Sequence, residues 1–92
     1  MKLYGILVSY YPEYAHKALT KFEYILAQLN ANYKIIIACG PQSPLSLRAD
    51  TINYSNTHWE FSGWQEALHA LETQHTIEPN DLIVFANDTF CM

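Results

Sequence analysis

The side chains best suited to chemistry in this sequence stand together in the triplet Asn87-Asp88-Thr89. The triplet directly follows the apolar run 82–86, whose length and composition predict a buried strand. A carboxylate between an amide and a hydroxyl offers hard oxygen ligands, which Mg²⁺ or Mn²⁺ prefers when the ion also holds phosphates. The alternative interpretation is an aspartate that caps the turn after the strand. Both interpretations place Asp88 at the end of the last strand.

Two glutamates and four histidines are the other side chains that could serve in acid–base or metal chemistry. Glu60 precedes a predicted helix and could reach the site, whereas Glu66 is predicted to be a solvated helix position. No two histidines have the spacing of a metal site, and His69 and His75 fall off a common helical face. Surface positions are therefore predicted for all four, which are His16, His58, His69 and His75.

Apolar runs that alternate with amphipathic segments determine the predicted architecture. Strands are predicted at Leu3–Ser9, Tyr33–Ala38, Thr51–Tyr54 and Asp81–Ala86, and helices at Glu13–Leu29 and from Ser62 onward. The first two strands are apolar nearly throughout, as is typical of strands buried on both faces. Strands that alternate with helices imply an α/β fold with a parallel sheet and right-handed crossovers. We expect the 92 residues to form one domain.

Both predicted helices present one apolar face to the sheet. The face consists of Ala15, Leu19, Phe22, Leu26 and Leu29 on the first helix, and of Trp64, Ala67, Leu68 and Leu71 on the second. The tetrapeptide 62–65, Ser-Gly-Trp-Gln, fits a capping box, so the second helix is predicted to begin at Ser62. For Trp59, which precedes this helix, two interpretations stay open, a core residue or a ring that lines a pocket.

The carboxyl edge of the predicted sheet is the expected place for a ligand, because open parallel sheets bind ligands beyond the carboxyl ends of their strands. The segments expected at that edge are 9–12, 39–42, 55–57 and 87–89, together with the helix start at Ser62. Of the adjacent residues Tyr10 and Tyr11, one must face inward and the other outward.

The composition restricts the partners and the compartment. The net charge is −4 and the five Lys and Arg residues are scattered, so no basic stripe is present to bind nucleic acid. No apolar stretch has the length of a membrane span, and the N-terminus lacks the parts of a signal peptide. Cys39 and Cys91 form no C-x-x-C motif and are interpreted as reduced thiols of a cytoplasmic protein.

Three segments together resemble the N-terminal half of a GT-A type glycosyltransferase of the bacterial polysaccharide-synthesis kind. They are ILVSYY (6–11), EFSGWQEAL (60–68) and DLIVFANDTF (81–90), of which the last two are distinctive. The resemblance covers nearly all of the chain. It implies a three-layer, Rossmann-like (GT-A-like) half-domain with a mostly parallel sheet of about four strands in the order 3-2-1-4 and a helix on each face.

The same resemblance implies a site for a nucleotide-diphosphate sugar at the carboxyl edge of the sheet. In such enzymes the end of the first strand touches the base, and a later acidic motif, often Asp-x-Asp, holds a metal ion and the diphosphate. The residues implied to bind the donor are Ser9, Tyr10, Tyr11, Glu60, Ser62, Asn87, Asp88 and Thr89, with Asp88 as the ligand of Mg²⁺ or Mn²⁺. Segment 39–41 carries no acidic residue and the motif has one aspartate, so weaker or no metal binding is expected.

The end of the sequence adds two expectations. The acceptor-binding half of the family, with its usual catalytic base, follows the acidic motif, whereas this sequence stops at Met92. We therefore expect a truncated or partial domain without transferase activity alone, and no catalytic residue is assigned. In the order 3-2-1-4 the last strand is a sheet edge, and an apolar, unpaired edge invites pairing with another chain. A homodimer that buries Phe85 or Phe90 is expected.

Two other functional classes stay open. A non-enzymatic interaction module would keep the fold and use the exposed edge to bind a partner. A flavodoxin-like or receiver domain is the weaker alternative, because no acidic cluster follows the first strand and no glycine-rich phosphate loop is present.

Overall fold

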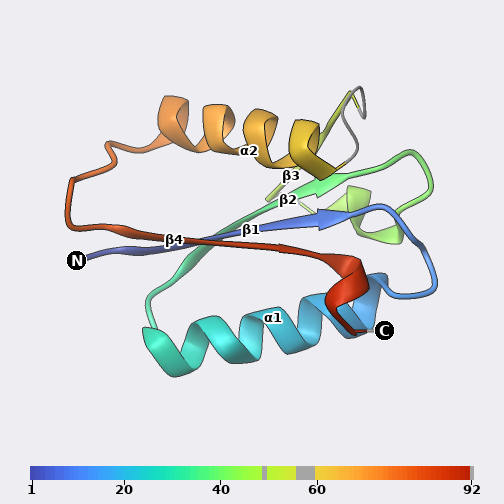
Figure 1. The fold of residues 1–92 in the computed structure, drawn as a ribbon, viewed down its shortest axis with the longest axis horizontal. Coiled ribbons are helices and arrows are strands. Elements are labelled where there is room, and N and C mark those ends of the chain that lie inside the picture. Colours follow the sequence, from blue (N-terminus) through green and yellow to red (C-terminus); the bar gives the residue numbers. More distant parts are fainter. Residues whose placement is uncertain (49, 56–59, 92) are drawn as a thin grey trace.

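A sheet of four parallel strands forms the middle layer of the protein (Figure 1). The computed structural model describes residues 1–48, 50–55 and 60–91. Within these ranges the strands are β1 (Leu3–Ser9), β2 (Lys34–Cys39), β3 (Thr51–Asn53) and β4 (Leu82–Asn87), in the order β3-β2-β1-β4. The predicted α/β fold, parallel sheet and strand order are confirmed.

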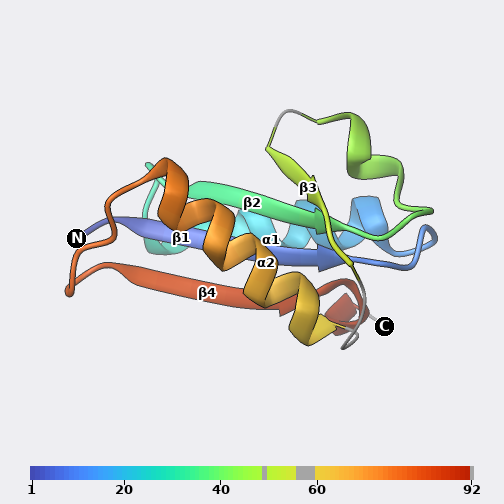
Figure 2. The ribbon, with the colours of Figure 1, turned by 90° about the horizontal axis from the view of Figure 1, so that it is seen from above.

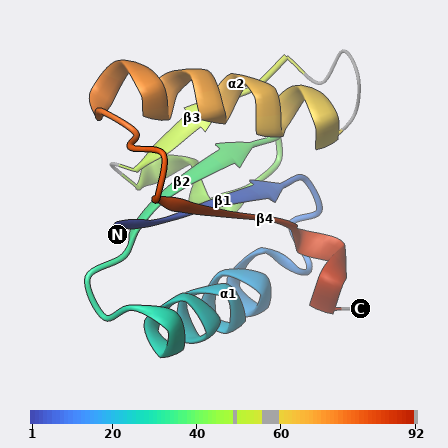
Figure 3. The ribbon, with the colours of Figure 1, turned by 60° about the vertical axis from the view of Figure 1, so that its left-hand side comes forward.

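One helix covers each face of the sheet. Helix α1 (Ala15–Leu29) and helix α2 (Glu60–Gln74) lie on opposite sides of the strands, which gives the three predicted layers (Figure 3). Two 3-10 turns complete the described structure, at Pro44–Leu47 before β3 and at Asp88–Cys91 after β4.

Strand β1 is the centre of the core, since all seven of its residues are buried. Its side chains alternate between two clusters, as the pleat of a strand requires. The cluster towards α1 includes Leu3, Leu7, Phe22 and Leu26, and the cluster towards α2 includes Tyr4, Ile6, Val8, Ala67 and Leu71. The apolar run at the start of the sequence is therefore buried on both faces, as predicted.

Two glycines allow both helices to lie close to β1. A Cβ atom added to Gly5 would collide with Leu26 of α1. A Cβ atom added to Gly63 of α2 would lie 2.7 Å from Cγ2 of Val8. The two helices thus contact the same strand at positions where a side chain is missing.

The boundaries of five predicted elements are wrong by one or two residues. Strand β2 spans Lys34–Cys39 and not Tyr33–Ala38, and β3 ends at Asn53. Helix α2 begins at Glu60, so Ser62 lies inside the first turn and is not the predicted N-cap. The negative charge of Glu60 in this first turn is favourable beside the positive end of the helix dipole. Helix α1 begins at Ala15 and not at Glu13, because the chain first forms a turn in which the Tyr14 amide bonds to the Tyr11 carbonyl. Strand β4 continues beyond Ala86, through Asn87.

Three side chains also depart from their predicted surroundings. Leu29, predicted on the buried face, is 56% exposed because it is the last residue of α1 and lies past the final core position, Leu26. His75 is half-buried and its ring lies against Tyr4, with 5.6 Å between the ring centroids, whereas His16 and His69 are exposed as predicted. Glu66 is not a purely solvated position, since its carboxylate accepts hydrogen bonds from the backbone and hydroxyl of Ser55.

Strand β4 forms one edge of the sheet, as Figure 2 shows. Within the described ranges it pairs with β1 alone, which leaves its outer edge without a partner strand. Leu82 and Phe85 of this strand and Phe90 in the following turn are exposed large hydrophobic residues. The predicted edge position of the last strand is therefore confirmed.

Candidate functional site

A cavity of about 450 Å³ opens at the carboxyl ends of β1 and β4. This is the edge of the sheet at which the sequence predicts a ligand. Its lining comes from the end of β1 and the loop after it, the residue after β3, the first turn of α2 and the end of β4. The lining residues are Val8, Tyr10, Tyr11, Tyr54, Glu60, Asn87, Asp88 and Thr89.

Asp88 occupies the inner wall of this cavity and is 1% exposed. One of its oxygens, Oδ2, accepts hydrogen bonds from two consecutive backbone amides, at 2.7 Å from Tyr10 and 2.5 Å from Tyr11. Burial raises the pKa of Asp88, while the two amide bonds act in the opposite direction. The carboxylate therefore ties the end of β4 to the loop after β1, a role that neither sequence interpretation contained.

Six of the eight residues predicted to bind a donor line the cavity together, and two do not. Ser9 is fully buried, and its Oγ lies 2.7 Å from Oγ of Ser43, so this hydroxyl is turned into the protein. Ser62 is also buried and lies outside the lining. The prediction for both serines rests on their position in the chain, which does not show whether a side chain faces the cavity or the core.

Tyr54 is a cavity residue that the sequence analysis missed. It directly follows β3, which ends at Asn53 and not at Tyr54 as predicted. Burial, followed by the nearby charge of Asp88, raises the pKa of Tyr54 to about 12, so its hydroxyl stays protonated at neutral pH. The signal for Tyr54 in the sequence is its place at the carboxyl end of a short predicted strand, directly before the segment 55–57 that is expected at the edge.

The remaining sequence candidates are outside the cavity or outside the described residues. Cys39 is a free, buried thiol, and burial raises its pKa. Trp64 is half-buried against the α2 cluster, and its indole N–H donates a hydrogen bond to the Ala86 carbonyl at 3.0 Å. Asn56, Thr57, His58 and Trp59 lie outside the described residues, and the side chain of Cys91 is likewise not described.

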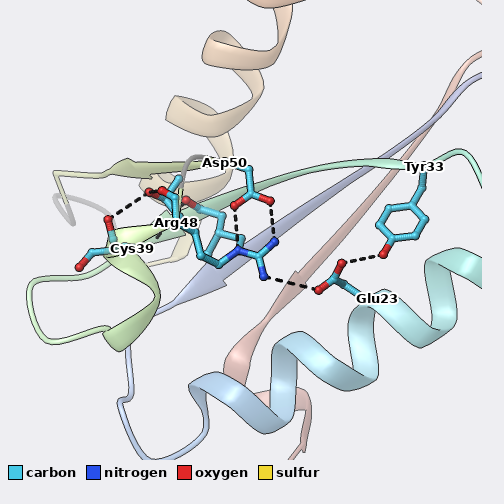
Figure 4. Close-up of polar contacts among 8 residues, drawn as sticks. Glu23, Tyr33, Cys39, Arg48 and Asp50 are labelled. Atoms are coloured by element: carbon cyan, nitrogen blue, oxygen red, sulfur yellow. Dashed lines mark hydrogen bonds and ion pairs between the residues drawn. The ribbon is translucent and has the colours of Figure 1, made fainter.

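A charged network lies away from the cavity, between α1 and the segment that precedes β3 (Figure 4). The Arg48 guanidinium donates two hydrogen bonds to Asp50, at 2.9 and 2.7 Å, and lies 3.7 Å from a Glu23 oxygen. The Tyr33 hydroxyl donates to Glu23 at 2.6 Å. The bond from Arg48 lowers the pKa of Asp50. This network fastens the loop before β3 to α1 and contributes no residue to the cavity lining.

The charge of the cavity lining is negative. Its two ionisable acids are Glu60 and Asp88, and no lysine, arginine or histidine is among the described residues that line it. The described ranges also contain no cluster of three or more His, Cys, Asp or Glu side chains able to hold a metal ion. A bound cation would therefore need most of its ligands from another source, such as phosphate oxygens and water.

In the part of the chain that the structure describes, neither helix combines the length and the hydropathy required to cross a membrane. An α/β fold of this kind hosts many unrelated functions, so the chemistry of the cavity must decide which ligand fits. No family model, curated protein or solved structure matches this chain.

Proposed function

We propose that the cavity binds a nucleotide-diphosphate sugar. The observation that supports this most directly is the junction of the β1 end with the β4 end in one cavity, because the resemblance assigns the base to the first segment and the diphosphate to the second. The volume of about 450 Å³ lies within the range of small-molecule pockets. The Tyr10 and Tyr11 rings offer stacking surfaces, and Asn87 and Thr89 offer polar groups for sugar hydroxyls.

The proposal covers binding and not sugar transfer by these 92 residues alone, because the resemblance is restricted to the donor-binding half of such enzymes. The proposal includes a divalent cation, because the carboxylates of Glu60 and Asp88 would otherwise repel a diphosphate. Mg²⁺ or Mn²⁺ is commonly held by one or two carboxylates plus substrate phosphates, and these two residues would supply the carboxylates. Bound there, the ion would neutralise phosphate charge. The proposed compartment is the cytoplasm, in keeping with the free thiol of Cys39.

Calorimetry with UDP-, GDP- and dTDP-glucose, each with and without Mn²⁺, tests this proposal. We expect one nucleotide to bind, and Tyr11→Ala to weaken binding by roughly tenfold, as the loss of one stacked ring does. The matched control is Tyr24→Ala, which removes an equally large ring from the exposed side of α1. Equal affinities of the two variants would contradict the assignment of the cavity, and the absence of binding by every donor would defeat the proposed function.

The edge of β4 supports a second proposal, a homodimer. Phe85 is 45% exposed, and a groove of about 390 Å³ runs past it from Phe22 and Phe90 on one face to Trp64 on the other. Strand β4 carries no charged residue or proline, the usual features that protect an exposed edge. The Ala86 carbonyl already accepts a hydrogen bond from the Trp64 indole N–H. Pairing between two copies would therefore involve the first part of the strand.

Light scattering after size exclusion tests the dimer. We expect a dimer at high micromolar concentration and a monomer for Phe85→Lys, because the lysine charge would be buried between the two edges. Tyr24→Lys is the control, since it exchanges an exposed ring for the same charge on α1. A monomeric wild-type protein, or loss of the dimer in both variants, would reject pairing through β4.

A further inference from the structure

Two hydrogen bonds join the Asp88 side chain to the loop after β1, and they are the only such bonds among the described residues. The backbone amides of Tyr10 and Tyr11 donate them, and both end on the same oxygen, Oδ2. Consecutive backbone N–H groups that point to a common centre form an anion-binding concavity, used by many proteins for phosphate. Here the bound anion is the side-chain carboxylate of Asp88. The carboxylate that fills the concavity also lines the cavity, so a ligand in the cavity would lie beside the same two amides.

The surroundings of Asp88 give its carboxylate little other support. Glu13 acts on it as a second negative charge, Glu60 adds another to the lining, and Tyr54 is held protonated. A buried carboxylate without a cation is costly, and the groups that lower the pKa of Asp88 are the Tyr11 and Tyr10 amides, followed by the backbone of Asp88 itself. An arriving phosphate could accept the same hydrogen bonds and carries more charge.

We infer that Asp88 is a tethered anion that occupies a phosphate subsite, and that a phosphate group of the ligand takes over the Tyr10 and Tyr11 amides while the carboxylate moves into the cavity. The ligand class follows from the proposed function, on which the inference in part rests. Nothing covalent changes, since one acceptor replaces another at two N–H groups. The exchange makes Asp88 an internal competitor, so removal of its charge is expected to strengthen anion binding.

The two other roles that Asp88 could have, a metal ligand and a purely structural tie, give different results. Replacement of a metal ligand would weaken the binding of a nucleotide with Mn²⁺, and the relief of charge repulsion alone would tighten a metal-free anion without moving the Tyr10 and Tyr11 amide signals. A purely structural tie would, on replacement, loosen the loop and weaken every ligand. Only a competitor gives both tighter binding of a metal-free anion when its charge is removed and the largest signal shifts at the Tyr10 and Tyr11 amides.

The test uses inorganic pyrophosphate with a chelator present, titrated into the full chain and followed by the backbone amide signals in NMR. We expect Asp88→Asn and Asp88→Ala to bind pyrophosphate about tenfold more tightly than the wild type, since the competing bonds are of the strong, charge-assisted kind. In the wild type and both variants, the amide signals of Tyr10 and Tyr11 are expected to shift most. Unchanged or weaker affinity in folded variants would overturn the inference.

Asp81 provides the matched control. Its carboxylate also accepts two backbone amides, from Lys2 at 2.8 Å and Glu78 at 2.8 Å, but at the start of β4, away from the cavity. Asp81→Asn is expected to leave the pyrophosphate affinity unchanged, and an equal gain in this variant would contradict a specific exchange at Asp88.

Two outcomes separate this inference from the proposed function. Pyrophosphate that shifts the Tyr10 and Tyr11 amides supports the exchange even if no nucleotide sugar binds, in which case the proposed function alone fails. Nucleotide sugar binding that leaves both amide signals in place overturns the exchange alone. The wild-type titration gives this answer without either variant, so misfolding of the variants does not remove the test.

Discussion

Replacement of Phe22 by alanine is expected to remove most of the free energy of unfolding of the protein. Phe22 is 1% exposed, packs against β1 within the α1 cluster, and meets Phe90 edge to face at 6.4 Å between ring centroids. Truncation of a buried phenylalanine costs about 3–5 kcal/mol, and a small domain has a total stability near the low end of about 5–15 kcal/mol. Urea unfolding followed by circular dichroism measures the loss.

The control for this variant is Phe61→Ala, the same substitution at a residue that is 63% exposed. Phe61 makes an edge-to-face contact with Trp64, so a loss of at most about 1 kcal/mol is expected. If both variants lose similar free energy of unfolding, the core does not lie where the structure places it. Phe90 directly precedes Cys91 in the turn that Asp88 begins, so repacking at Phe22 is also expected to disturb the cavity wall.

The layers of the fold could be predicted because the relevant signals are local. The run Leu3–Ser9 is apolar at almost every position, which is the pattern of a strand covered on both faces, and each residue is buried. The alternation of strands and helices then leaves few topologies. The errors occur where tertiary packing decides, as at Leu29, whose helical spacing fits the apolar face although the helix ends beyond the core.

The position of the site could be predicted, but not its internal bonding. The rule that ligands bind at the carboxyl edge brought Tyr11, Glu60 and Asp88 together correctly. The hydrogen bonds that the Tyr10 and Tyr11 amides donate to Asp88 join residues 78 and 77 positions apart in the chain. No local pattern specifies such a contact. For the same reason Ser9 was assigned to the ligand, whereas its hydroxyl is paired with Ser43 in the interior.

Asp88 therefore links the two proposals for the cavity in a way that the sequence could not show. As a donor-site acid it would have to be available to a ligand, yet its Oδ2 is bonded to two amides. The exchange inferred above removes this conflict, because the ligand itself would release the carboxylate. The described lining carries two carboxylates and no lysine, arginine or histidine. A metal ion would therefore have to accompany the diphosphate, because the carboxylates repel it.

Substitution of Gly63 by valine is expected to destabilise the protein by about 3 kcal/mol, the upper end of the usual cost of overpacking. The new Cβ atom would lie 2.7 Å from Cγ2 of Val8, 3.2 Å from its Cγ1 and 3.5 Å from Cβ of Ala38. Val8 is buried in the central strand and β-branched, so its rotamer cannot turn away at low cost. Valine has a somewhat better helix propensity than glycine, so the loss would be steric.

A double-mutant cycle with Val8→Ala separates this collision from a general defect of the helix. Val8→Ala removes both contacting methyl groups and by itself leaves a cavity, which also destabilises the core. In the double variant the valine on α2 fills the space vacated on β1, so the combined loss is expected to be smaller than the sum by at least about 1 kcal/mol. Additive losses would show that α2 does not approach β1 at Gly63.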